Sequence, residues 1–151
     1  MTLVIENVTD ARALATLDAR VRGSDAWPIS RFISMTHDAY DLLGLTDRNT
    51  QALLAFAVFS LGPFDIGLEM IAVDPDHRRQ GLAGRLIEAM IDKGEAMGLE
   101  RVLLEVRASN EAAQALYARY GFSVDGRRAG YYPLAPGRRE DAILMSRPLT
   151  L

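Results

Sequence analysis

Residues 66–106 combine a strand, a helix and a second strand, and this unit constrains the fold more than any other part of the chain. Over 66–73 we expect a strand with Ile66, Leu68, Met70 and Ala72 on one face and Gly67, Glu69, Ile71 and Val73 on the other. A helical apolar pattern follows over about 82–97 and ends at Gly98. Residues 101–106 then have the composition of another strand. A helix that joins two strands of one sheet makes a right-handed crossover, so the two strands pair in parallel. The helix start and the end of the second strand are therefore expected at one edge of the sheet, where ligands of open α/β sheets bind.

The segments on both sides of this unit extend the same sheet. Three strands with short links, over 40–45, 51–60 and 66–73, predict an antiparallel meander. Before the meander we expect a strand over 4–8, a helix capped by Asp10 that runs to about residue 21, and a short helix capped by Ser30. After the unit we expect a helix over 111–120 capped by Ser109 or Asn110, a strand over 122–125 with a distorted continuation to 132, a loop over 133–141 and a last strand over 142–147. The whole predicts a mixed α/β fold.

Composition narrows the class of protein. The 151 residues, 49% of them hydrophobic, suggest one domain over 1–151. The absence of cysteine excludes disulfides and an acyl-cysteine intermediate, and His37 and His77 lack metal-site spacing, so we expect no metal. The net charge of −3 provides no general field for nucleic acid. The apolar run 52–59 is too short to span a membrane, and the first residues lack a signal-peptide pattern, so we expect a soluble cytoplasmic protein.

The stretch between the strand and the helix of this unit has the features of an anion site. A helix start exposes unpaired backbone N–H groups and the positive end of a dipole. Small residues let a ligand approach the backbone, and arginines surround it; these residues are Gly81, Ala83, Gly84 and Arg78, Arg79, Arg85. The spacing is neither a Walker loop nor G-x-G-x-x-G. By itself the stretch is compatible with a phosphate or nucleotide site and with an ordinary surface loop.

Two acidic residues lie in the strands of the same unit. On an alternating strand Glu105 shares a face with Leu103 and Arg107, which by itself indicates a half-exposed surface. Glu69 lies on the neighbouring strand, shortly before Val73. A carboxylate at this edge of the sheet has the chemistry of a general base.

Aromatic residues have structural interpretations when spacing alone is considered. Trp27, the only tryptophan, fits a lid on the core, which we favour, or one wall of a substrate groove. Tyr117 lies at core spacing on the helix 111–120, and Tyr131 and Tyr132 form an aromatic pair near a strand end.

Taken together, these segments resemble the GNAT superfamily of acyl-CoA-dependent N-acetyltransferases. Residues 78–83, Arg-Arg-Gln-Gly-Leu-Ala, match its motif Gln/Arg-x-x-Gly-x-Gly/Ala. Several later segments are similar to the RimI group within that superfamily, which acetylates the N-terminal alanine of a small-subunit ribosomal protein. These segments are 104–110, 115–117, 120–122, 127–128 with 131–133, and 140–143. The resemblance covers about 71–148 and is loose before that.

The resemblance implies a GNAT fold, with an antiparallel N-terminal meander, a central parallel strand pair and flanking helices. It implies acetyl-CoA as cosubstrate, with its pyrophosphate on the backbone of 79–84 and its pantetheine arm beside 71–73. A backbone N–H near Val73 would polarise the thioester carbonyl. The cofactor-binding residues that it implies are Ile71, Ala72, Val73, Arg78, Arg79, Gln80, Gly81, Leu82, Ala83, Gly84 and Asn110.

The resemblance also assigns the chemistry. Glu105 matches the general base, Tyr117 matches the acid that protonates the leaving thiolate, and Glu69 is the second choice for the base. The amine attacks directly in a ternary complex. The residues expected at the acceptor groove are Trp27, Glu69, Arg128, Tyr131 and Tyr132.

Two departures from the RimI pattern concern the acceptor side. Trp27-Pro28 reverses the usual Pro-Trp order, and Arg138-Arg139 adds one arginine to a loop. They keep open a small-molecule amine or a lysine side chain as acceptor. A non-catalytic acyl-CoA-binding domain is a further alternative, against which the presence of both Glu105 and Tyr117 argues.

Overall fold

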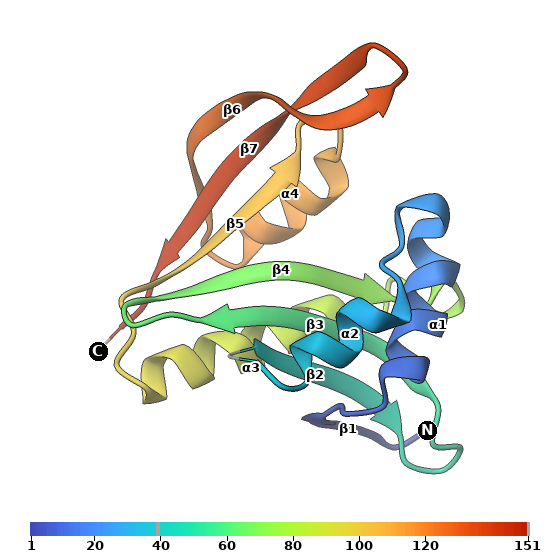
Figure 1. Ribbon diagram of the computed structural model, residues 1–151. Coiled ribbons are helices and arrows are strands. Elements are labelled where there is room, and N and C mark those ends of the chain that lie inside the picture. Colours follow the sequence, from blue (N-terminus) through green and yellow to red (C-terminus); the bar gives the residue numbers. More distant parts are fainter. Residues whose placement is uncertain (39, 151) are drawn as a thin grey trace.

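The computed structural model describes residues 1–38 and 40–150 and contains one seven-stranded sheet in the order β1-β2-β3-β4-β5-β7-β6 (Figure 1). The strands are β1 (Leu3–Asn7), β2 (Tyr40–Asp47), β3 (Leu53–Leu61), β4 (Asp65–Val73), β5 (Arg101–Arg107), β6 (Ser123–Ala135) and β7 (Arg138–Pro148). The helices are α1 (Ala11–Arg22), α2 (Ile29–Met35), α3 (Leu82–Ala96) and α4 (Glu111–Arg119), with 3₁₀ turns η1 (Gly23–Asp25) and η2 (Pro75–His77). None of the helices in the described residues is long and apolar enough to cross a membrane.

The strand pairing confirms the predicted meander and crossover. β1 to β4 pair antiparallel in chain order, and β4 pairs in parallel with β5. The parallel ladder joins Asp65–Leu68 to Arg101–Leu104 and ends there. Beyond it the two strands diverge, so that β4 and β5 form the arms of a V (Figure 1). The sheet is therefore open at its centre, at the carboxyl ends of both strands.

Helices cover both faces of the meander, and each face has its own core. Leu86, Ile87 and Met90 of α3 pack with Ala57 and Phe59 of β3 on one face. On the other face α1 and α2 contribute Leu14, Leu17, Phe32 and Met35, which pack with Phe56 and Val58. Since successive residues of β3 serve opposite cores, this strand is apolar throughout.

A β-bulge at Glu69 corrects one sequence prediction. The register between β3 and β4 passes from Val58↔Met70 to Phe59↔Leu68, which leaves Glu69 as the extra residue. The side chain of Leu68 therefore belongs to the α3 core, whereas Met70 belongs to the α1–α2 core. The prediction that alternate residues from Ile66 to Ala72 share one face was wrong, because the bulge exchanges the two faces.

Helix caps were predicted from the sequence for α1, α2 and α4, and two of the three are confirmed. The carboxylate of Asp10 accepts a hydrogen bond from the N–H of Ala13 at 3.1 Å, as predicted for α1. Asn110, one of the two candidates, caps α4 by accepting from the N–H of Ala113 at 3.1 Å. Ser30 was wrong as the cap of α2, because the helix begins at Ile29 and Ser30 lies inside its first turn; Pro28, with an extended backbone, takes the N-cap position without a side-chain hydrogen bond.

The C-terminal part is a long hairpin, where a loop over 133–141 was predicted. β6 pairs with β7 as far as Ala135↔Arg138, and Gly137 makes the turn with a φ of +76°. Three register shifts distort the pairing of β6. Because residues 133–139 are exposed on both faces of the hairpin, no buried face imposes an alternating pattern on them. The link between β2 and β3 also differs: β2 continues to Asp47 and β3 begins at Leu53, two residues after the predicted start.

Candidate active site

The divergence of β4 and β5 opens a cleft with a volume of about 1960 Å³. Most residues predicted as site residues line it: Trp27, Glu69, Ile71, Val73, Arg78, Arg79, Gly81, Leu82, Ala83, Gly84, Glu105, Asn110, Tyr117, Arg128, Tyr131 and Tyr132. Two do not line it. Ala72 is buried in the α1–α2 core on the other side of β4, and Gln80 is exposed outside the cleft.

The start of α3 presents backbone donors to this cleft. Arg79 and Gly81 both have left-handed φ angles, of +63° and +74°, which shape the turn into the helix. Among residues 1–38 and 40–150, no side chain caps the helix at Gly81. The first bond of the helix runs from the N–H of Arg85 to the carbonyl of Gly81, so the preceding N–H groups have no helical acceptor. Uncapped donors and a helix dipole, lined by arginines, suit a phosphate.

The edge of β4 that faces the cleft is free to take another extended chain. Ile71 and Val73 pair with Ala57 and Ala55 of β3 on one side. On the other side, the ladder to β5 ends at Leu68 in the described part of the chain. Backbone groups at such an edge bind an extended ligand as an added strand.

Glu105 projects from β5 into the cleft, on the half-buried face of that strand. Its Oε1 lies 3.3 Å from Nη2 of Arg128 on β6. The Arg128 guanidinium lies in turn 4.6 Å from the ring centroid of Tyr131. Glu105 thus lies in the cleft beside an ion-pair partner that itself contacts an aromatic ring.

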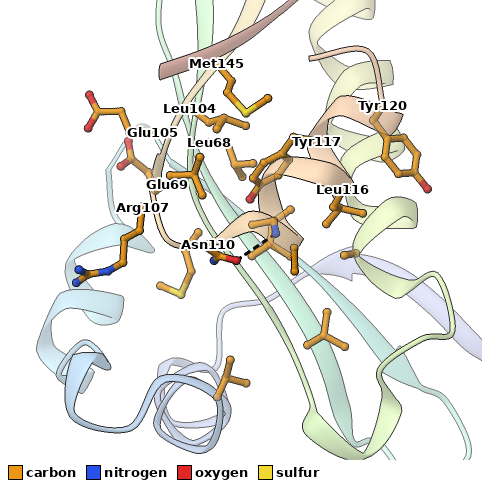
Figure 2. Close-up of a pocket in the computed structure, with 18 of the residues that line it drawn as sticks. Leu68, Glu69, Leu104, Glu105, Arg107, Asn110, Leu116, Tyr117, Tyr120 and Met145 are labelled. Atoms are coloured by element: carbon orange, nitrogen blue, oxygen red, sulfur yellow. Dashed lines mark hydrogen bonds between the residues drawn. The ribbon is translucent and has the colours of Figure 1, made fainter. Parts of the chain in front are cut away.

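Glu69, the bulged residue, faces the same space as Glu105 (Figure 2). Partial desolvation in the cleft raises the pKa of Glu69 above its usual value, and the nearby negative charge of Glu105 adds to the rise. Arg31 and a hydrogen bond from Ser60 act in the opposite direction on this pKa. Two carboxylates with unequal environments therefore line the cleft side by side.

Tyr117 lies on α4, across the cleft from both carboxylates, with Leu68 and Leu104 between them (Figure 2). Its ring packs 5.7 Å from the ring of Phe122, centroid to centroid. Burial raises the pKa of Tyr117 to about 12, with a smaller contribution from Tyr132. Tyr117 is therefore a stable hydrogen-bond donor at neutral pH.

Aromatic rings and arginines line two walls of the cleft. The rings of Tyr131 and Tyr132 lie 4.9 Å apart, and the guanidinium of Arg107 lies 4.5 Å from the Tyr132 ring centroid. On the opposite wall, Arg31 lies 3.7 Å from the Trp27 ring centroid. Trp27 packs against the α1–α2 core, as the favoured interpretation predicts, and it also lines the cleft.

The cleft also contains polar residues that were not predicted as site residues, among them Arg31, Arg107 and Tyr120. Arg107 could have been predicted from the sequence, because on an alternating strand it shares a face with Glu105. Arg31 contacts Trp27, and Tyr120 contacts Gly84. These contacts arise only in the assembled fold, so no sequence pattern marks the two residues.

Comparisons with known proteins agree with this geometry. The acetyltransferase (GNAT) family model matches residues 10–122. The chain is 42% identical over 125 residues to the ribosomal protein bS18-alanine N-acetyltransferase of Escherichia coli K12, covering 83% of this chain and 82% of that protein. It is 39% identical over 150 residues to the enzyme of the same name from Salmonella typhimurium LT2, covering 99% of both. The crystal structure of the ribosomal-protein-S18-alanine N-acetyltransferase from Escherichia coli matches with a TM-score of 0.90 at 37% identity, over 99% of this chain and 96% of that one.

Proposed function

Because the chain belongs to the acetyltransferase (GNAT) family, as the resemblance predicted, we propose that it transfers an acetyl group from acetyl-CoA to a protein N-terminal amine. The proposed acceptor is the N-terminal alanine of ribosomal protein bS18, after the names of relatives that align over most of this chain. One observation carries the proposal: the cleft between β4 and β5 has the uncapped start of α3, Glu105 and Tyr117 on its walls. A cytoplasmic location, where ribosomal proteins are made, is part of the same proposal.

The donor half of the cleft fits an acyl-CoA. The N–H groups at the start of α3 would hold the pyrophosphate, and Arg78 and Arg79 add positive charge beside it. The pantetheine arm would lie along the free edge of β4 at Ile71 and Val73. In the proposed complex a backbone N–H near Val73 polarises the thioester carbonyl. Asn110 lines the same space, although its side chain already caps α4.

In the proposed reaction the acceptor amine attacks the thioester carbonyl directly. An α-ammonium group has a pKa of about 8, so it must lose a proton before it attacks. Glu105 accepts that proton, directly or through a water, and Glu69 holds the amine beside it. A C–N bond forms, the C–S bond breaks, and the thiolate of CoA leaves. The absence of cysteine is compatible with this single-step transfer.

Tyr117 faces the leaving sulfur in this scheme. With a pKa of about 12, it is a weaker acid than a thiol, whose pKa is about 8.5. It therefore stabilises the departing thiolate first as a hydrogen-bond donor, and the proton on the released CoA is balanced by the one taken from the amine. This role needs a protonated tyrosine, which the burial of Tyr117 ensures.

An acceptor panel tests the proposal. Acetyl transfer is measured to hexapeptides that begin with Ala, Ser or Met, to a peptide with a blocked N-terminus and a free lysine, and to spermidine. We expect the peptide that begins with Ala to be the best acceptor. Transfer to spermidine alone would refute the peptide acceptor, and binding of acetyl-CoA without transfer to any acceptor would favour a non-catalytic domain. Calorimetry with acetyl-CoA and ATP checks the donor, since preference for ATP would refute an acyl-CoA site.

A further inference from the structure

Tyr120 and Gly84 make an unusually close contact between two helices at the donor end of the cleft. Gly84 lies in the first turn of α3 and is buried, and Tyr120 is the residue that ends α4. A Cβ atom built on Gly84 would overlap the hydroxyl oxygen of Tyr120 and lie 2.5 Å from its Cζ. The tyrosine hydroxyl therefore occupies the space that any larger residue at position 84 would fill.

The position of this hydroxyl is fixed by the chain around it. The N–H of Tyr120 donates to the carbonyl of Tyr117 at 3.0 Å, and the next residue, Gly121, turns the chain with a φ of +88°. The ring packs against the α3 core, and both Tyr120 and Gly84 line the cleft. Within the described residues, no protein group hydrogen-bonds to the Tyr120 hydroxyl. A donor is thus held at the start of α3, beside the free backbone N–H groups.

We propose that Tyr120 is a positioning residue for the donor, and that its hydroxyl supplies a side-chain hydrogen bond to the pyrophosphate of acyl-CoA, which residue 84, a glycine, has no side chain to make. This inference rests on the proposed acyl-CoA site, because it assumes that a phosphate lies at the start of α3. Arg78, Arg79 and Arg119 also line the cleft, and their positive charge favours the same occupant. The contact with Tyr120 also explains why residue 84 is a glycine. The backbone conformation does not explain it, because the φ angle of Gly84 is not left-handed.

Calorimetry of CoA binding to the free protein is the first test of this inference and needs no turnover; a transfer assay with a donor that lacks phosphate is the second. Tyr120→Phe keeps the ring on Gly84 and removes only the hydroxyl. Because a hydrogen bond to a charged group is lost, we expect CoA to bind about tenfold more weakly. Dephospho-CoA, which retains the pyrophosphate, should show the same loss. S-acetylpantetheine, which has no phosphate, should be used as a donor equally well by both proteins. Tyr40→Phe, on β2 and outside the cleft, is the matched control and should leave CoA binding unchanged.

A third experiment removes the hydroxyl from residue 120 and adds one at residue 84. Replacing the ring by Tyr120→Leu makes room at position 84, and Gly84→Ser in that background returns a hydroxyl to the same place from the other helix. The double variant Gly84→Ser with Tyr120→Leu should bind CoA several-fold more tightly than Gly84→Ala with Tyr120→Leu, which differs only by that hydroxyl. Thermal midpoints of the two double variants show whether both fold equally well.

The outcomes separate this inference from the proposed function. If the unchanged protein does not bind CoA, the acyl-CoA site itself is wrong, and the role of Tyr120 fails with it. If the unchanged protein binds CoA and Tyr120→Phe binds it within twofold as well, the acyl-CoA site stands and the role of Tyr120 is refuted. Loss of S-acetylpantetheine use in Tyr120→Phe would also refute it, because the effect would then not concern a phosphate.

Discussion

The guanidinium of Arg128 lies 3.3 Å from the carboxylate of Glu105, so the proposed base is ion-paired before any acceptor is bound. The side chains of Glu105 and Arg128 are 30% and 52% exposed. An ion pair this open to solvent is worth no more than about 1 kcal/mol. We therefore expect that the ammonium group of an acceptor can replace the guanidinium of Arg128 beside Glu105 at little cost in free energy.

Glu105→Gln should lower kcat/KM for the acceptor peptide about 100-fold near pH 7, because a general base contributes on this order. The loss should shrink as the pH rises above about 8, where the α-amine is already neutral. Steady-state rates from pH 6 to pH 9.5 measure this. Glu69→Gln is the matched variant: a larger loss in it than in Glu105→Gln at low pH would make Glu69 the base.

Tyr117→Phe should lower kcat about tenfold or more, and the KM values for both substrates should change little, since the hydroxyl is needed only when the thiolate leaves. The packing against Phe122 is retained in this variant, so its thermal midpoint should stay close to that of the unchanged protein. In the unchanged protein, the pKa of about 12 predicts no fall in kcat from ionisation of Tyr117 below about pH 11. An unchanged kcat in Tyr117→Phe would contradict the assignment.

Gly81→Ala should cost about 1–2 kcal/mol of unfolding free energy, because Gly81 has a φ of +74° that L side chains rarely adopt. It should also weaken CoA binding, since a shift of the turn moves the N–H groups of α3. Gly137→Ala is the control, with a φ of +76° in the β6–β7 turn. Chemical denaturation and calorimetry should show similar stability losses in both variants and weaker CoA binding in Gly81→Ala alone; equal CoA affinities would contradict a phosphate site at this turn.

Asp74→Asn should destabilise the protein by about 1–2 kcal/mol at pH 7, because Asp74 accepts from Arg20 at 2.7 Å and Arg20 is half exposed. Burial by itself raises the pKa of Asp74, but hydrogen bonding from the Asp76 N–H and the charge of Arg20 outweigh it, so the net pKa lies below 3.8. A lowered folded-state pKa gives stability that is present above the unfolded value and lost as the pH falls through the folded one. The unfolding free energies of the unchanged protein and of Asp74→Asn, measured by denaturation at each pH, should therefore converge as the pH falls below about 3.8. Asp76→Asn, whose side chain is 79% exposed, should have little effect at any pH.

Local chemistry explains the parts of the fold that sequence could predict. The caps at Asp10 and Asn110, the helical period of α3 and the parallel pairing of β4 with β5 depend on neighbouring residues or on one crossover. The glycine-spaced start of α3 is local as well. For this reason the sequence alone predicts which residues meet where the start of α3 lines the cleft.

Longer-range relationships explain what the sequence left out. β4 is covered by helices on both faces, so its residues are apolar on either side of Glu69 and no pattern marks the bulge. The exposed β6–β7 hairpin has no buried face to impose alternation. The contacts of Glu105 with Arg128 and of Gly84 with Tyr120 join residues far apart in the chain, and only the assembled sheet brings them together.

The most direct measurement is the position of the acetyl group on one acceptor that offers two amines. A hexapeptide that begins with alanine and contains one internal lysine is incubated with acetyl-CoA and the protein, and fragmentation in a mass spectrometer locates the added group. We predict a single acetyl group on the α-amine of alanine, at a rate that falls in Glu105→Gln. Acetylation of the lysine side chain in place of the α-amine, or no acetylation of this peptide while spermidine is acetylated, would contradict an N-terminal acetyltransferase.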